Sequence, residues 1–266
     1  MNSANAQFGW GHDMTSQGFL STLATGIALA LLPLHATAAP ITVPNFSFEN
    51  PDVADSFTSA AVPDWLFASS SVFFGSAEVL DPPAATYTGT GGNNTPLHGS
   101  GDGGQLADLN TFSGGFAGSY TLTTATDLAT VMDNTMYTLT VALGDRKTGT
   151  PFPVTAIDLL VNGSLVASTF ANAATIPDDT FTDFSTSFST GTADPLTGGS
   201  LRIRLRAEST TFQVFVSDFD NVRLAQTTLP TAAPVPEPHT LVLLGLGLIA
   251  SISGAGIHRR FTRSSR

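Results

Sequence analysis

The strongest constraint on the fold of this chain is a two-residue apolar alternation in its central part. In residues 137–143 (YTLTVAL) every second side chain is a large apolar one, and in residues 201–207 (LRIRLRA) apolar residues alternate with arginines. This period places alternate side chains on opposite faces of a β-strand, one toward a core and one toward water. After Ala39 no long segment carries the 3.6-residue apolar period of an amphipathic helix. The chain is therefore predicted to be β-structured from Ala39 onward.

Turn residues between the apolar segments indicate how the strands connect. Asn162-Gly163 separates the apolar segments 157–161 and 165–170, and this dipeptide favours a two-residue type I′ hairpin. Other turn residues recur about every ten positions, as they do between short strands. The Gly-, Pro- and Asn-rich segment 81–104 is expected to form a long loop. The sum predicts an all-β domain, an antiparallel β-sandwich over residues 39–226.

Charge and cysteine content exclude several functional classes. Residues 39–228 contain six Lys or Arg and nineteen Asp or Glu, a net charge of −13. An acidic domain lacks the basic surface that nucleic-acid binding requires, so no nucleic-acid partner is expected. The chain has no cysteine, which excludes thiol nucleophiles and Cys-based metal sites. A domain of this size can build a core without disulfides.

The first 38 residues have the features of a secretory signal peptide. An apolar segment, 19–34, precedes the small residues Ala36-Thr37-Ala38, which match the pattern that signal peptidase cleaves. Cleavage is predicted before Ala39, and Met14 is an alternative start. No Lys or Arg precedes the apolar segment, so an uncleaved N-terminal anchor is the alternative.

The C-terminal segment 235–266 combines a short motif, an apolar stretch and a basic end. The apolar residues 241–257 approach the roughly 20 residues that a helix needs to cross a bilayer. Arg259 and Arg260 follow at once and are expected to stay cytoplasmic and anchor the tail. A Pro-containing linker, 227–234, joins this segment to the domain. The domain itself is then predicted to lie outside the inner membrane.

This order of parts, with Pro236, Glu237 and Pro238 as its motif, resembles the PEP-CTERM sorting signal. The resemblance implies export by a Gram-negative, exopolysaccharide-producing bacterium. It also implies processing by an exosortase after signal peptidase has acted, and then a place at the cell surface or outside the cell. The alternative is a plain single-pass anchor with a Pro-rich stalk.

A second resemblance lies in the domain. Residues 45–49 (NFSFE), Trp65, 137–141 and 218–224 (DFDNVRL) look like the landmarks of galactose-binding-like jelly rolls, the fold of many carbohydrate-binding modules. The resemblance implies a structural calcium ion held by Glu49 and Asp220, with main-chain oxygens near Ser47 as further ligands. The alternative is that both residues are ordinary carboxylates at strand ends.

Candidate ligand-binding residues are few. Trp65 and Tyr87 are the predicted sugar-contacting rings, with Phe67 and Tyr120 as further candidates, because aromatic rings offer a large apolar area. The competing interpretation is core packing, since nineteen Phe accompany only three Tyr and two Trp. Trp65, next to two apolar residues, is expected to be buried.

Catalytic motifs are not evident in the sequence. Residues 99–104 fit G-x-G-x-x-G, but no helix is predicted after them, so a dinucleotide site is rejected. His98 is the only histidine of the domain, and no G-x-S-x-G or H-E-x-x-H motif occurs. The chain is therefore expected to be a non-enzymatic surface or matrix protein that contacts polysaccharide. A lectin-like module with a defined glycan site and a surface glycoside hydrolase are the alternatives.

Overall fold

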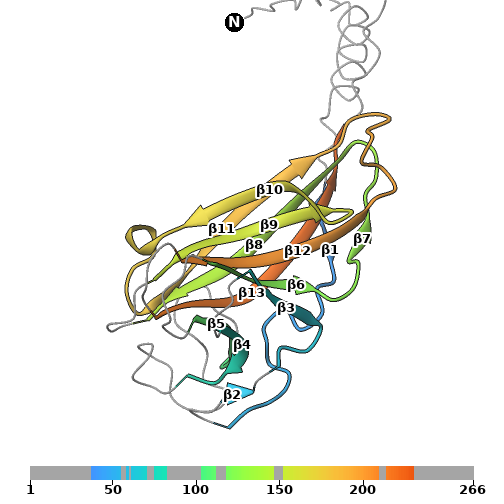
Figure 1. Cartoon of the computed structure of the whole chain (residues 1–266). Helices are drawn as coiled ribbons and strands as arrows, with labels where there is room; N and C mark the ends of the chain where they lie inside the picture. Colours follow the sequence, from blue (N-terminus) through green and yellow to red (C-terminus); the bar gives the residue numbers. More distant parts are fainter. Residues whose placement is uncertain are drawn as a thin grey trace, which may run out of the picture. The chain divides into compact units, whose positions relative to one another are not determined.

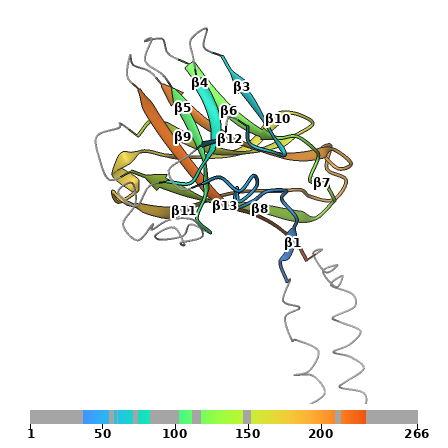
Figure 2. The same cartoon turned by 90° about the horizontal axis from the view of Figure 1, so that it is seen from below.

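Two antiparallel sheets make up the part of the chain that the structure, a computed structural model, describes. That part comprises residues 37–54, 58–59, 61–70, 75–82, 103–111, 118–146, 152–209 and 214–230. Figures 1 and 2 show the two sheets as stacked layers. The sandwich predicted from the alternation is confirmed. The predicted signal helix and the apolar C-terminal helix lie outside the described residues.

The larger sheet has the strand order β11-β8-β13-β5-β4-β2, and β1 also pairs with β13. Its strands are β1 (Ala39–Ile41), β2 (Thr58–Ser59), β4 (Gly75–Leu80), β5 (Leu106–Thr111), β8 (Thr135–Asp145), β11 (Thr180–Ser189) and β13 (Phe215–Thr228).

The smaller sheet has the order β10-β9-β12-β6-β3, and β7 also pairs with β12. Its strands are β3 (Trp65–Ser69), β6 (Gly118–Thr124), β7 (Ala129–Thr130), β9 (Val154–Val161), β10 (Ser164–Ala171) and β12 (Ser200–Ser209). A short 3-10 helix, η1 (Ala173–Thr175), follows β10.

The core lies between the two sheets and is built by the predicted alternation. The side chains of Leu139, Val141, Ile203 and Leu205 are fully buried, whereas Thr138 and Thr140 of β8 and the arginines of β12 are only half-buried. Arg202, Arg204 and Arg206 lie on the outer face of β12 and pair with Asp127, Asp158 and Glu208. The inward apolar face and the outward position of the arginines were predicted from the alternation.

The hairpin between β9 and β10 also agrees with the sequence. Asn162 and Gly163 have φ values of 50° and 76°, the positive pair that a type I′ turn requires. Val161 and Ser164 are paired on either side of the turn.

The last strand, β13, differs in detail from its sequence pattern. The alternation of Phe212, Val214 and Val216 predicts that the last strand begins with these residues. Instead β13 begins at Phe215, and Phe215 and Phe219 join the core while Val214 is exposed. Residues 216, 218 and 220 therefore belong to the opposite face of the sheet.

The first and last strands are neighbours. Ala39 pairs with Gln226 and Ile41 with Leu224. A register shift in β13 follows Asp220, and there the backbone N–H of Val222 donates to the carbonyl of Phe46 (2.8 Å). The loop after β1 is thereby attached to the last strand. Within the described ranges, no helix is long and apolar enough to span a membrane.

Candidate active site

A group of buried charged residues lies on the outer face of the larger sheet. Asp108 of β5 sits between Glu78 of β4 and Asp218 of β13 in the register of the sheet. The flanking residues Ala107, Leu109 and Phe219 belong to the core, so Asp108 and Asp218 point to the other face. Their exposed fractions are nonetheless only 3% and 1%.

One guanidinium joins the two aspartates. Arg146, directly after β8, donates from Nε to Asp218 Oδ2 (2.7 Å) and from Nη2 to Asp218 Oδ1 (2.8 Å). Its Nη2 also donates to Asp108 Oδ2 (2.8 Å). We call these three residues the Arg146 cluster. The pairing is uneven. Asp218 accepts from both Nε and Nη2 of Arg146, whereas Asp108 accepts only from Nη2, which also donates to Asp218.

Asp108 is the member of the cluster that most easily holds a proton. Burial, and then the negative charge of Asp218, raise the pKa of Asp108 to about 7, although Arg146 acts in the opposite direction. Asp108 Oδ1 is buried and has no hydrogen-bond partner among the described residues. A carboxyl group in this state can be neutral near pH 7 and carry its proton on the free oxygen.

Further carboxylates make the surroundings more negative. Burial, followed by the charges of Asp178 and Asp218, raises the pKa of Asp145 to about 6. Glu78 adds to the rise at Asp108. Because Arg146 supplies one positive charge to several carboxylates, protonating one of them relieves repulsion.

Apolar side chains share this face with the Arg146 cluster. A small buried group, separate from the main core, consists of Leu80, Leu106, Ala142 and Phe181. Leu106 is two residues from Asp108 on β5, and Phe181 is paired with Gly144, which in turn is paired with Asp218. The carboxylates are thus bordered by an apolar patch, which explains why desolvation is the main cause of the pKa shift.

A pair of hydroxyls supports the cluster from the core side. Ser217 and Thr155 are fully buried, and their oxygens lie 2.7 Å apart. Ser217 precedes Asp218 on β13 and Thr155 is on β9, so this hydrogen bond links the two sheets immediately behind the cluster. Such a link holds β13 in a fixed position relative to β9.

The predicted aromatic ligand residues are not part of this site. Trp65 is 6% exposed and packs against Phe48, with ring centroids 5.6 Å apart. Tyr120 is buried and contacts Phe215 edge to face. Phe67 is 40% exposed, and Tyr87 lies outside the described residues. The expected burial of Trp65 is therefore confirmed, and its ligand role stays a prediction.

The predicted calcium ligands have other contacts. Glu49 Oε1 accepts from the backbone N–H groups of Gly104 and Gln105 (2.9 and 3.0 Å). Asp220 is fully buried, and its Oδ1 accepts from the N–H of Asn221 (2.6 Å). Within the described residues, no group of three or more His, Asp or Glu is arranged to hold a metal ion. Two carboxylates are fewer than the six to eight oxygens of calcium, so the site stays a prediction that needs main-chain ligands.

Comparison with known proteins identifies the domain. The family model HpiC1-like (HpiC1 cyclase) matches residues 39–225. The chain belongs to this HpiC1-like family. A second model, the PEP-CTERM protein-sorting motif, matches residues 234–260, so the chain is an exported protein with an exosortase-type sorting signal. The motif residues Pro236, Glu237 and Pro238, and Arg259 and Arg260, lie outside the described residues.

Solved cyclases share the fold of this HpiC1-like domain. The apo form of a cyclase from Fischerella sp. is 23% identical, with a TM-score of 0.57 over 73% of this chain and 98% of that one. The Stig cyclase Fisc from Fischerella sp. TAU, solved in complex with (3Z)-3-(1-methyl-2-pyrrolidinylidene)-3H-indole, is equally similar over 73% of this chain and 100% of its own. A Fischerella sp. TAU cyclase in complex with 4-(1H-indol-3-yl)butan-2-one is 24% identical, with a TM-score of 0.55 and the same coverage. No curated protein matches the chain.

The expectation of a non-enzymatic protein is wrong, because the domain belongs to a family of cyclases. The Arg146 cluster carries neither a nucleophile motif nor a metal-binding motif, so no sequence motif marks it. A signal was present in the sequence. Asp108, Asp218 and Asp220 each stand next to large apolar residues, and charged residues are rarely buried without a partner. That partner, Arg146, is 72 residues away from Asp218 in the chain.

Proposed function

We propose that this chain is an exported cyclase that uses the Arg146 cluster as its proton donor and acceptor. The observation that carries the proposal is the state of Asp108. Its pKa is raised to about 7 and its Oδ1 is buried without a partner in the described part of the chain. Membership in a cyclase family supports the reaction class.

The chemistry needs no co-reactant. Asp108 transfers the proton from Oδ1 to an electron-rich carbon of the substrate and becomes a carboxylate. The resulting cation is attacked by a second unsaturated carbon of the same molecule, which forms the new ring bond. The cyclised cation then loses a proton to Asp108, which restores the acid and gives the neutral product. Product and substrate are therefore isomers of equal mass. A pKa near the working pH suits a group that must both give and take a proton.

The other residues have supporting roles in this scheme. Asp218, which accepts two hydrogen bonds from Arg146, is placed to face the developing positive charge. Arg146 fixes the orientation of both carboxylates. Leu80, Leu106, Ala142 and Phe181 provide an apolar border, which keeps water from trapping a cation and favours an apolar, unsaturated substrate.

The test is a mass-balanced search for substrate. Purified full-length protein is incubated with an extract of a host strain that lacks its gene, and the compounds are followed by liquid chromatography and mass spectrometry. We expect one compound to be consumed while another of identical mass and different retention appears. The ketone 4-(1H-indol-3-yl)butan-2-one, which a Fischerella cyclase binds, serves as a first binding probe.

Two variants make the test specific. Asp108→Asn keeps the size of the side chain but holds no transferable acid proton, and should lower the rate of isomer formation at least 100-fold. Asp127→Asn, at an exposed ion pair of the smaller sheet, should leave the rate unchanged. Isomer formation that persists in Asp108→Asn, or extracts with no isomer pair, would argue against the proposal.

We also propose that the processed enzyme stays with exopolysaccharide. The sorting signal is the support for this location. Recovery of the protein in the polysaccharide fraction, and its release when that polymer is removed, would bear it out; recovery only as a free soluble protein would refute it.

A further inference from the structure

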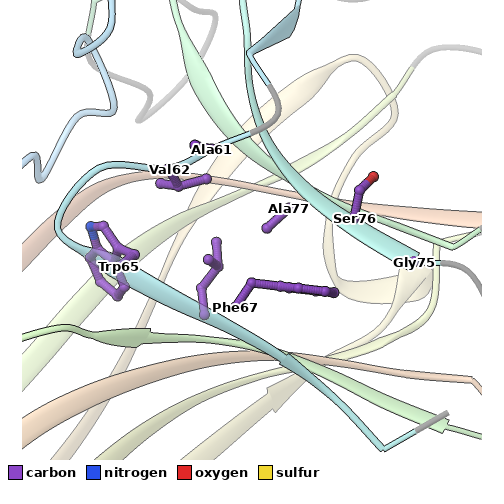
Figure 3. A pocket seen from close by; sticks show the side chains of 8 residues that line it. Ala61, Val62, Trp65, Phe67, Gly75, Ser76 and Ala77 are labelled. Carbon is purple, nitrogen blue, oxygen red and sulfur yellow. The ribbon is translucent and has the colours of Figure 1, made fainter. Parts of the chain in front are cut away.

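A pocket of about 370 Å³ lies at an open edge of the sandwich, on the core side of the larger sheet, whereas the Arg146 cluster lies on the outer face of that sheet. It forms where both sheets end. β3 is the last strand of the smaller sheet, and the two-residue β2 pairs only with Val79 and Leu80 of β4. Residues 75–77 of β4 thus have no outer partner among the described strands. Figure 3 shows β3 and β4 on opposite sides of the pocket.

The walls of this edge pocket are apolar and aromatic. Trp65 and Phe67 are two residues apart on β3, and Phe67 is paired with Leu122 of β6, so all three belong to one face. Opposite them lie residues 75–77, and Ala61 with Val62 completes the lining. Trp65 is fixed from behind by Phe48, whereas Phe67 at the rim is 40% exposed.

The chemistry of the lining restricts the ligand. The described lining has no ionisable side chain, and its one hydroxyl, that of Ser76, donates to Glu78 Oε1 (2.8 Å). A charged ligand would lose its hydration without compensation. The indole Nε1 of Trp65 is buried, so Trp65 offers the pocket its apolar ring and not its hydrogen-bond donor.

We propose that the edge pocket is a second binding site, for an uncharged aromatic ring compound. The volume is within the usual range for small-molecule sites, roughly 300–1,000 Å³. With no acid in the lining, the site binds a ligand and does not transform it. Neutral sugars are less suited, because their many hydroxyls need several polar partners and the lining offers few.

Tryptophan fluorescence tests this directly. The chain has two tryptophans, Trp10 and Trp65, so Trp65 is the only one in full-length protein carrying Trp10→Phe. Acetophenone, an aromatic ketone that quenches tryptophan, is the probe. We expect saturable quenching. Ala61→Phe, at an exposed rim position, should weaken the binding at least tenfold by filling the entrance.

Matched variants separate this site from others. Ala174→Phe, the same change at an exposed position of η1, should leave the titration unchanged, and so should Asp108→Asn. Quenching that rises linearly without saturation, or equal affinity in Ala61→Phe, would overturn the proposal. Saturation by galactose in place of acetophenone would overturn the ligand class. Loss of acetophenone binding in Asp108→Asn would place the ligand at the Arg146 cluster and also refute the edge site.

Discussion

Asp108 and Asp218 occupy directly opposed positions on β5 and β13 and share the guanidinium of Arg146. The two carboxylates share one cation beside an apolar patch, and they differ in the number of hydrogen bonds that they accept from it. Both carboxylate oxygens of Asp218 accept from Arg146, whereas Asp108 keeps one oxygen without a partner in the described residues. This asymmetry assigns the acid role to Asp108, because the less well paired carboxyl is the one that takes a proton.

The first prediction concerns stability as a function of pH. The pKa of Asp108 is about 7 in the folded protein against an ordinary value of 3.8, so between these values the folded state binds more protons than the unfolded state. Its contribution to the free energy of unfolding therefore falls as pH rises from about 4 to about 7, by up to about 1.4 kcal/mol per pH unit. Asp145, with a pKa of about 6, acts in the same direction.

Urea unfolding of full-length protein at a series of pH values measures this effect. In Asp108→Asn the free energy of unfolding should depend less steeply on pH between about pH 4 and pH 7, because the contribution of Asp108 is gone. The variant should also be more stable than wild type above pH 7. Asp127→Asn is the control. The hydrogen bond from Arg202 lowers the pKa of Asp127, so Asp127 changes the free energy of unfolding with pH only below about pH 4. Equal slopes in wild type and Asp108→Asn would contradict the raised pKa.

The second prediction concerns Arg146. Replacing it with Met leaves two buried carboxylates without their cation, and should lower the free energy of unfolding by about 3–5 kcal/mol. Arg146→Lys should recover only part of this loss, because an ammonium group lacks the fork that binds Asp218 at two oxygens. Arg202→Met is the matched control, since its partner Asp127 is exposed and surface ion pairs contribute little to stability. Similar losses at Arg146 and Arg202 would show that the cluster is no stronger than a surface pair.

The features that could be predicted from the sequence are those formed by residues close together in the chain. The alternation in β8 and β12 and the turn at Asn162-Gly163 act over a few residues, so sequence was sufficient for the sandwich and its hairpin. β13 was harder, because apolar residues occupy both of its faces and only pairing with β5 and β8 decides which face meets the core. The Arg146 cluster depends on three strands distant in sequence, so its residues looked like separate charges.

The third prediction concerns calcium at Glu49 and Asp220. If calcium binds there, its removal with EDTA should lower the melting temperature and added calcium should restore it. Glu49→Gln is informative because an amide oxygen can still accept from Gly104 and Gln105 while the negative charge is lost. Both Glu49→Gln and Asp220→Asn should then abolish the calcium response. A melting temperature that is unaffected by EDTA and calcium would remove the metal from the description of this domain.

The fourth prediction concerns processing. The sorting motif matches residues 234–260, and the chain leaves β13 at Thr228. The intact mass of protein from the host surface and medium should therefore correspond to a chain that begins at Ala39 and ends near Pro236. In a strain without its exosortase the C-terminal segment should remain, and replacing Pro236, Glu237 and Pro238 with Ala should have the same effect. A full-length C-terminus in both strains would mean that the segment is a simple anchor and that the cyclase works attached to the inner membrane.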